Sequence, residues 1–130
     1  MMRFLSVEEV QAHCDLPCGV YDPAQARIEA QSVKAIVEKY HGNDDPAFRA
    51  RALQIKEERS DLVKHHLWVL WTDYFKPPHF EKYPQLHQLF NEATKLAGAG
   101  GTKGSTDVAV ADQLLTKIDE IDKIFWETKA

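Results

Sequence analysis

Two Asp-Pro steps, each followed by a long stretch without glycine or proline, constrain the fold of this chain most. Asp22 precedes Pro23, and Asp45 precedes Pro46. Aspartate is a preferred N-cap, and proline is well tolerated at the first helical position. Behind each step, apolar residues recur with the spacing of an amphipathic helix. We therefore expect one helix from residue 23 to about 40, and a second from residue 46 that ends at Lys76–Pro78.

The apolar spacing also predicts which residues face inward, and it adds two further helices. A third helix is expected from about residue 79 to 96, and a fourth from about 107 to 127. The residues expected inward on the first two helices are Ile28, Ala35, Ile36 and Tyr40, then Phe48, Ala52, Ile55, Leu62, His66 and Val69. Those on the last two are Leu86, Leu89, Phe90 and Ala93, then Val108, Ala111, Leu115, Ile118, Ile121 and Phe125.

Four amphipathic helices with mostly short connections predict an all-α protein, an antiparallel four-helix bundle over about residues 23–127. No strand-like alternation appears in the sequence. The glycine-rich stretch from Gly98 to Thr106 is expected to be a mobile surface loop. Residues 1–22 are expected to form an irregular N-terminal arm.

The composition narrows the possible partners. The chain has 130 residues, a formal net charge of −4 and a pI near 5.8. Because no basic stripe is present, no nucleic-acid partner is expected. No run approaches the ~18 consecutive apolar residues of a membrane-spanning helix, so no membrane partner is expected either.

Residues 1–12 read as a short leader. Its single basic residue, Arg3, is followed only by FLSV before Glu8, whereas a secretory signal needs an apolar run of about 7–15 residues. We therefore expect a cytoplasmic protein. The sequence VQA before His13 resembles a small-residue cleavage site, which suggests that a dedicated protease removes the leader.

The arm holds the chain's only two cysteines, Cys14 and Cys18, next to His13. Pro17 excludes helix between them, so CDLPCG is expected to form a compact turn with both thiols on one side. In a cytoplasmic protein such a pair is more often metal-binding or redox-active than a structural disulfide. Zinc or an iron–sulfur cluster would normally need four side chains, and no second cysteine pair exists.

A chain beginning at His13 would offer a different donor set. Its α-amine, the amide nitrogen of Cys14 and the two thiolates could form a square plane, which suits Ni(II) or Cu(II), with the imidazole approaching axially. While Ala12 remains attached to His13, that amine is an amide and a poor ligand. The alternative is a pair of free thiols beside a solvated histidine.

Other histidines and aromatic residues also suggest sites. His65 and His66 are adjacent and point about 100° apart on a helix, so they do not converge on one metal. We interpret His66 as a core or interface histidine. The other histidines that could suggest a metal site are His79 and His87. The aromatic residues form a run of their own: Trp68, Trp71, Tyr74 and Phe75. This run is expected to pack between helices or subunits rather than bind a ligand.

The stretch HCDLPCGVYDP (residues 13–23) closely resembles the nickel-binding hook of nickel-containing superoxide dismutases, whose mature chain begins at that histidine. The family pattern His-Cys-x-x-Pro-Cys-Gly-x-Tyr is present in full. The likeness continues through GNDDP (42–46), KHH (64–66), TDYFKPPHFEKYP (72–84) and IDKIFWETK (121–129). It covers essentially residues 13–130.

The resemblance implies an oxidoreductase that converts superoxide to dioxygen and hydrogen peroxide by cycling one nickel ion per subunit between Ni(II) and Ni(III). It implies a hook at residues 13–21 with His13, Cys14 and Cys18 as the metal ligands. It also implies that the enzyme becomes active after removal of residues 1–12, and that it assembles as a homohexamer.

The resemblance also implies roles for residues around the hook. Glu29 and Arg59 match a pair that orients the axial imidazole. Arg59 also lies between Ile55 and Leu62 on the expected apolar stripe, where a cation needs a partner such as Glu29. The resemblance also implies that Asp15 and Tyr21 are catalytic residues, which shape the approach of the anion and hold water near the metal. It implies that Lys76 and Tyr74 reach a neighbouring subunit's site and attract superoxide.

Two rival functions use the same residues. One is a non-enzymatic carrier that delivers nickel or copper, and the other is a helical interaction module whose cysteines form a redox switch. A carrier needs exchangeable metal, whereas a redox catalyst needs a fixed axial imidazole. Tyr21 together with the Glu29–Arg59 pair therefore favours the catalyst.

Overall fold

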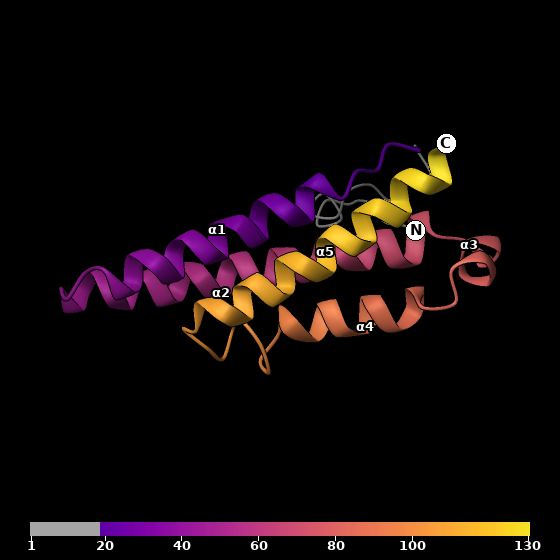
Figure 1. The fold of residues 1–130 in the computed structure, drawn as a ribbon. Coiled ribbons are helices and arrows are strands. Elements are labelled where there is room, and N and C mark those ends of the chain that lie inside the picture. Colours follow the sequence, from indigo (N-terminus) through magenta and orange to yellow (C-terminus); the bar gives the residue numbers. More distant parts are fainter. Residues whose placement is uncertain (1–18) are drawn as a thin grey trace, which may run out of the picture.

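The structure is a computed structural model that describes residues 19–130. Its long helices are α1 (Ala24–His41), α2 (Pro46–Val69), α4 (Leu86–Leu96) and α5 (Val108–Lys129). Helix α1 packs against α2 and α5, and α4 packs against α5 and α2, so the four close into a ring of neighbours. Consecutive long helices run in opposite directions (Figure 1), which confirms the predicted helical bundle.

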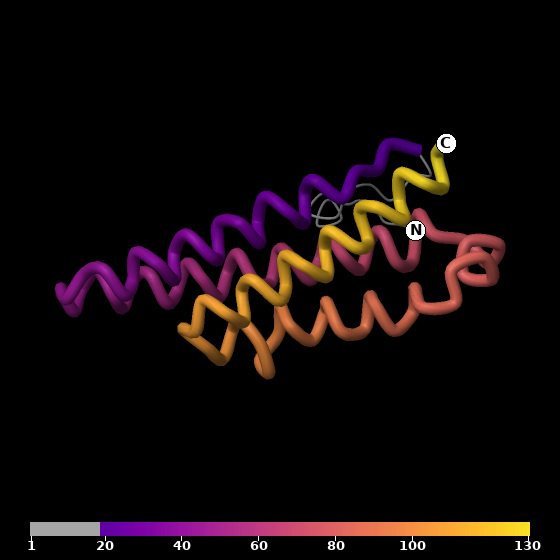
Figure 2. Tube along the Cα trace, in the orientation of Figure 1, coloured from indigo at the N-terminus to yellow at the C-terminus, as the bar shows by residue number. Residues whose placement is uncertain are grey.

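One end of the bundle gathers the segments that matter for the site. The start of α1, the end of α5 and the short helix α3 (Pro77–Lys82) all lie at this end (Figure 1). The trace in Figure 2 shows that the turn between α1 and α2 lies at the opposite end. Segments distant in sequence therefore meet where the chain enters its first helix.

The second Asp-Pro step begins a helix as predicted, and at the first the helix starts one residue later than predicted. The Asp45 side chain accepts a hydrogen bond from the backbone N–H of Phe48 at 2.9 Å, and Pro46 is the first helical residue. At the first step Pro23 is the N-cap, and the Asp22 side chain accepts from the N–H of Ala24, the first residue of α1, at 2.9 Å. Each carboxylate satisfies an N–H that has no partner inside its own helix.

The predicted inward face of α1 is wrong. Ile28 is 58% exposed, and Ala35, Ile36 and Tyr40 are only half-buried. The buried residues are instead Ala26, Ala30, Val33 and Val37. These small side chains repeat at helical spacing, and a stripe of small residues lets two helices approach closely. The bundle therefore buries the small stripe of α1 and leaves its largest aliphatic side chain outside.

The predicted face of α2 is also displaced. Ala52 and Val69 are buried as expected, but Phe48, Ile55, Leu62 and His66 are half-buried. The inward stripe continues through Lys56, Ser60, Val63 and Leu67. Two of these four residues are polar, so hydropathy alone does not identify the stripe. Their burial has a structural reason in the loop between α4 and α5.

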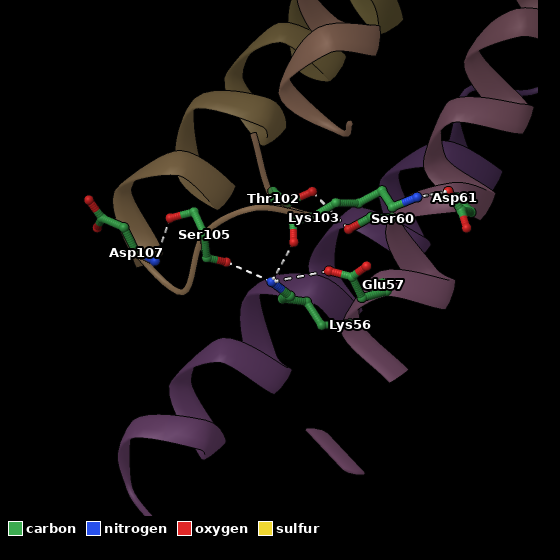
Figure 3. Close-up of polar contacts among 8 residues, drawn as sticks. All are labelled: Lys56, Glu57, Ser60, Asp61, Thr102, Lys103, Ser105 and Asp107. Carbon is green, nitrogen blue, oxygen red and sulfur yellow. Dashed lines mark hydrogen bonds and ion pairs between the residues drawn. The ribbon is translucent and has the colours of Figure 1, made fainter. Parts of the chain in front are cut away.

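That glycine-rich loop is packed against α2, which corrects the expectation of a mobile surface segment. Lys56 is 3% exposed, and its Nζ donates to the carbonyl oxygens of Ser105 at 2.8 Å and Lys103 at 3.3 Å. The hydroxyls of Ser60 and Thr102 share a buried hydrogen bond of 2.8 Å. Figure 3 shows these side chains of α2 pointing at the loop.

Glycine is required at two positions of this loop: at Gly101 by its close approach to α4, and at Gly104, where a Cβ would overlap the carbonyl oxygen of Ala99. A Cβ built on Gly101 would lie 1.9 Å from the carbonyl oxygen of Leu96, whereas one on Gly100 would meet nothing within 4 Å. The N–H of Thr102 also donates to the Leu96 carbonyl, at 2.7 Å. The loop is thus tied to the end of α4 as well as to α2.

Helix α2 ends in a π-helical turn, η2 (Leu70–Tyr74), which the sequence did not predict. The N–H of Phe75 donates to the carbonyl of Leu70, five residues back. The wider turn changes the angular spacing of the side chains that follow it. Phe75 is buried in the core, and Tyr74 is half-buried at the bundle's end.

The predicted third helix is two helices. Helix α3 ends at Lys82 and α4 begins at Leu86, because Pro84 interrupts the pattern between them. The inward residues of α4 are as predicted. On α5, Asp107 caps the helix, and the predicted residues Ala111, Ile118, Ile121 and Phe125 are buried; Val108 and Leu115 are half-buried, with Leu114 taking a core position. Among residues 19–130, no helix is long and apolar enough to cross a membrane.

Candidate metal centre

The predicted metal ligands His13, Cys14 and Cys18, together with Asp15, lie outside the described residues. The first described residue, Gly19, has φ of +77°, a left-handed conformation that only glycine adopts at little cost. The chain therefore makes a glycine-dependent turn directly after Cys18. Two residues later, Tyr21 contacts the bundle.

Tyr21 packs against Tyr74. Their ring centroids lie 5.6 Å apart with an interplanar angle of 59°, and both rings are half-buried. Because Tyr21 follows Cys18 by only three residues, Tyr74 stands next to the base of the predicted hook. The predicted site residues Tyr21 and Tyr74 are thus brought together within one chain.

Tyr74 is held on several sides. Its ring lies 4.4 Å from the ring of Phe125 and stacks on His79 at 5.8 Å with an angle of 7°. The Nζ of Lys129 stands 5.3 Å from its centroid. The Tyr74 hydroxyl is 2.7 Å from the Thr128 hydroxyl. The last turn of α5 therefore completes the environment of this tyrosine.

Glu29 and Arg59 form the ion pair expected from the sequence. The Nη1 of Arg59, on α2, donates to the Oε1 of Glu29, on α1, at 3.0 Å. The Glu29 side chain is 17% exposed and that of Arg59 39%. The carboxylate is thus fixed while the guanidinium keeps contact with solvent. Their predicted action on the His13 imidazole involves a residue outside the described part.

Lys76 is exposed and folds back on its own segment. Its Nζ donates to the carbonyl of Asp73 at 2.9 Å, and its backbone N–H donates to the Nδ1 of His79 at 3.0 Å. Its predicted role in attracting superoxide stays a prediction. Nearby, burial raises the pKa of the Tyr83 phenol, and a hydrogen bond with Glu127 raises it further. Tyr83 therefore stays neutral over the physiological pH range.

His87 and Trp71 have structural contacts. The Nδ1 of His87 accepts from the indole N–H of Trp71 at 3.0 Å, and its ring stacks on Phe80 with centroids 3.8 Å apart. Trp71 stacks on Phe90. Over residues 19–130, no group of three or more His, Cys, Asp or Glu side chains is placed to hold a metal ion.

Sequence reasoning missed three residues near the predicted site: Phe125 as a wall of the tyrosine pair, Thr128 and Lys129. No local signal marks them, because Thr128 lies 54 residues from Tyr74 along the chain. Only the antiparallel return of α5 brings its last turn beside η2. The family-like segments around residues 72–84 and 121–129 are the two that meet here.

Comparisons with known proteins agree with this arrangement. The sequence profile of nickel-containing superoxide dismutases matches residues 8–129. The nickel superoxide dismutase of Streptomyces coelicolor is 67% identical over 120 residues, which cover 92% of this chain and 90% of that protein. This chain belongs to the nickel-containing superoxide dismutase family. The enzyme of Streptomyces seoulensis is 66% identical over 121 residues, covering 93% of this chain and 91% of its own.

Solved structures of the family have the same fold. A native nickel superoxide dismutase superimposes with a TM-score of 0.87 at 67% identity, covering 90% of this chain and 98% of its own. An apo structure superimposes with a TM-score of 0.82 at 65% identity, covering 85% and 98%. The arrangement of the helices is therefore that of the family.

The donor chemistry of the arm fits the family's metal. Two thiolates suit a soft, electron-rich site, and in a chain beginning at His13 an amine, an amide nitrogen and an imidazole would complete a set that suits Ni(II) or Cu(II). The described residues add an anchor for the arm at Tyr21 and a fixed carboxylate at Glu29.

Proposed function

We propose that this chain is a nickel superoxide dismutase, which converts two superoxide anions and two protons to dioxygen and hydrogen peroxide. The observation that carries this proposal is the 67% identity to a nickel superoxide dismutase over 92% of the chain. The complete hook pattern at residues 13–21 supports it.

His13, Cys14 and Cys18 would hold the nickel. The chemistry that the metal supplies when bound is a one-electron couple between Ni(II) and Ni(III). The protein's part is to hold the metal ligands in place and to limit how superoxide approaches the site. Glu29, held by Arg59, would orient the His13 imidazole, as a carboxylate commonly does for a histidine ligand. Tyr21 and Asp15 would limit the approach to small anions and hold water.

We further propose that residues 1–12 are a propeptide removed by a protease. Cleavage after Ala12 would convert an amide nitrogen into a free amine, a much better ligand. The peptide bond between Ala12 and His13 would then keep the precursor inactive. Action in the cytoplasm is a further prediction, which fractionation of cells would test.

A homohexamer is also part of the proposal. Exposed apolar side chains support association between copies: Val20 is 67% exposed, Ile28 58% and Trp68 45%. Large apolar and aromatic side chains are enriched in the centres of protein interfaces. The expected role of Lys76 at a neighbouring subunit's site depends on this assembly, whereas Tyr74 lies beside Tyr21 of its own chain. Sedimentation of the nickel-loaded enzyme would test the assembly.

The test of function compares three proteins loaded with nickel: the chain starting at His13, the same chain with Cys18→Ser, and the full 130-residue chain. Metal content and the rate of superoxide decay are measured for each. We expect rapid decay only for the first. Bound nickel without superoxide removal would favour the carrier function, and full activity of the 130-residue chain would contradict the amine ligand.

A further inference from the structure

The hydroxyl of Tyr74 belongs to a hydrogen-bonded chain that ends on the backbone of α5. Tyr74 Oη lies 2.7 Å from Thr128 Oγ1, and the Thr128 hydroxyl in turn donates to the carbonyl oxygen of Phe125, one turn earlier. Such a bond from threonine to a preceding carbonyl is common within helices. The last member of this hydrogen-bonded series is the carbonyl oxygen of Phe125, which can only accept.

Counting protons fixes the direction of every bond in this chain. A threonine hydroxyl carries one proton, and here that proton goes to Phe125. The contact between Thr128 and Tyr74 must then use the proton of the tyrosine. Tyr74 therefore donates to Thr128 and has only its oxygen lone pairs left for any other partner.

The position of the ring keeps this direction in place. Phe125 and His79 confine the Tyr74 ring, and Lys129 stands over its face. Rotation of the O–H bond is the freedom that remains, and within residues 19–130 the Tyr74 hydroxyl is hydrogen-bonded to the hydroxyl of Thr128. Turning the proton away would leave Thr128 without its donor, at a cost comparable to one hydrogen bond.

We propose that Thr128 is a positioning residue that makes Tyr74 an acceptor, and not a donor, toward the metal-binding arm. This inference rests on the proposed function, in which the arm next to Tyr21 is the site of reaction. Superoxide, azide and halide anions need hydrogen-bond donors. Water and hydrogen peroxide can donate. Tyr74 would therefore disfavour anions beside the arm and accept bonds from protonated species.

The proposal changes the role expected for Tyr74 from its resemblance to the family. A tyrosine that attracts superoxide would offer its proton to the anion. Here the proton is committed to Thr128, so any attraction must come from cationic groups such as Lys76 and Lys129. Tyr74 acts instead by withholding a donor from anions beside the arm, superoxide and azide alike, and by accepting bonds from protonated species such as hydrogen peroxide.

Azide tests this in the nickel-loaded enzyme, through equilibrium binding followed in the visible spectrum and through inhibition. Thr128→Val keeps the side-chain shape and frees the Tyr74 proton to turn toward the arm. We expect azide to bind about tenfold more tightly, as one added charge-assisted hydrogen bond allows. Thr128→Ser keeps the hydroxyl and should bind azide as the parent does.

A double variant separates the hydroxyl's effect from repacking. In a Tyr74→Phe background there is no proton to release, so Thr128→Val should leave azide affinity unchanged. An unchanged affinity in Thr128→Val alone, or an equal gain in both backgrounds, would overturn the proposal. Fold integrity is checked for every variant by circular dichroism.

A neutron structure of the full chain gives a readout independent of any activity. We expect the deuteron between the two hydroxyls to be bonded to Tyr74. A deuteron bonded to Thr128 and pointing at Tyr74 would overturn the proposal. If the nickel-loaded parent failed to remove superoxide, the proposed function would fall, while the deuteron position and the azide affinities would still decide the role of Thr128.

Discussion

Replacing Lys56 by methionine should destabilise the protein by releasing the loop between α4 and α5. The ammonium donates to two loop carbonyls, those of Ser105 at 2.8 Å and Lys103 at 3.3 Å. Methionine has a similar length and an apolar stem, so the core contacts are largely kept. What the variant loses is the pair of hydrogen bonds that fixes the loop on α2.

The size of the effect follows from opposing terms. A hydrogen bond to a charged group contributes about 1.5–3 kcal/mol, so the shorter bond and the longer one together favour the lysine by several kcal/mol. Removing a buried charge recovers part of this, and water can reach the half-buried carbonyls once the loop opens. We expect a net loss of about 2 kcal/mol, which for a chain of this size lowers Tm by roughly 6–10 °C.

Thermal and urea unfolding of Lys56→Met measure this loss. Lys95→Met is the matched control, because Lys95 is exposed on α4 and its loss should change stability by no more than about 0.5 kcal/mol. Hydrogen exchange of the loop amides should accelerate only in Lys56→Met. If Lys56→Met were as stable as the parent, the loop would be held by other contacts and the reasoning would be refuted.

Three further predictions concern the loop and the ion pair. Gly101→Ala should lower the free energy of unfolding by at least about 2 kcal/mol, because its Cβ would overlap the last carbonyl of α4, whereas Gly100→Ala should be nearly neutral in the same urea titration. Burial lowers the pKa of the Lys56 ammonium below the 10.5 of the unfolded chain, so the unfolded state binds more protons at pH values just below 10.5. The free energy of unfolding of the parent should therefore rise with pH relative to that of Lys56→Met. We expect the difference in stability between the two proteins to widen from pH 7 toward pH 10. Glu29→Gln should reduce dismutase activity about 10- to 100-fold while Glu58→Gln does not, and equal activities in a superoxide decay assay would remove Glu29 from the proposed site.

The sequence predicted those parts of the fold that depend on neighbouring residues. The Asp45 cap and the apolar face of α4 use signals contained within a few turns, and both are present. The inward faces of α1 and α2 failed for a different reason. Large apolar residues such as Ile28 were expected inside, but the bundle selects small residues at a close helix contact and accepts Lys56 where a loop supplies its partners. Neither choice is visible before the helices are paired.

The same distinction holds at the candidate site. The family resemblance pairs Arg59 with Glu29, and the structure has the ion pair. The supporting reason, an arginine on an apolar stripe, fails, because that face of α2 is only half-buried and the Arg59 side chain is 39% exposed. The contact of Tyr74 with Thr128 could not be found that way, since it depends on a π-helical turn and on the return of α5. The family resemblance includes residues 72–84 and residues 121–129, but it does not reveal that these two segments are in contact.

These contacts explain why a short arm needs a whole bundle. Residues 13–21 are too few to bury apolar surface of their own, so the arm must take its order from what it packs against. At its base, Tyr21 meets a tyrosine whose ring packs on Phe125 and whose hydroxyl is hydrogen-bonded to Thr128. The position of α5 depends in turn on the loop that Lys56 holds at the far end of the helix. Loosening that loop should therefore weaken the support of the arm as well as lower stability, through helix α5, which joins the loop to the end where Tyr74 lies.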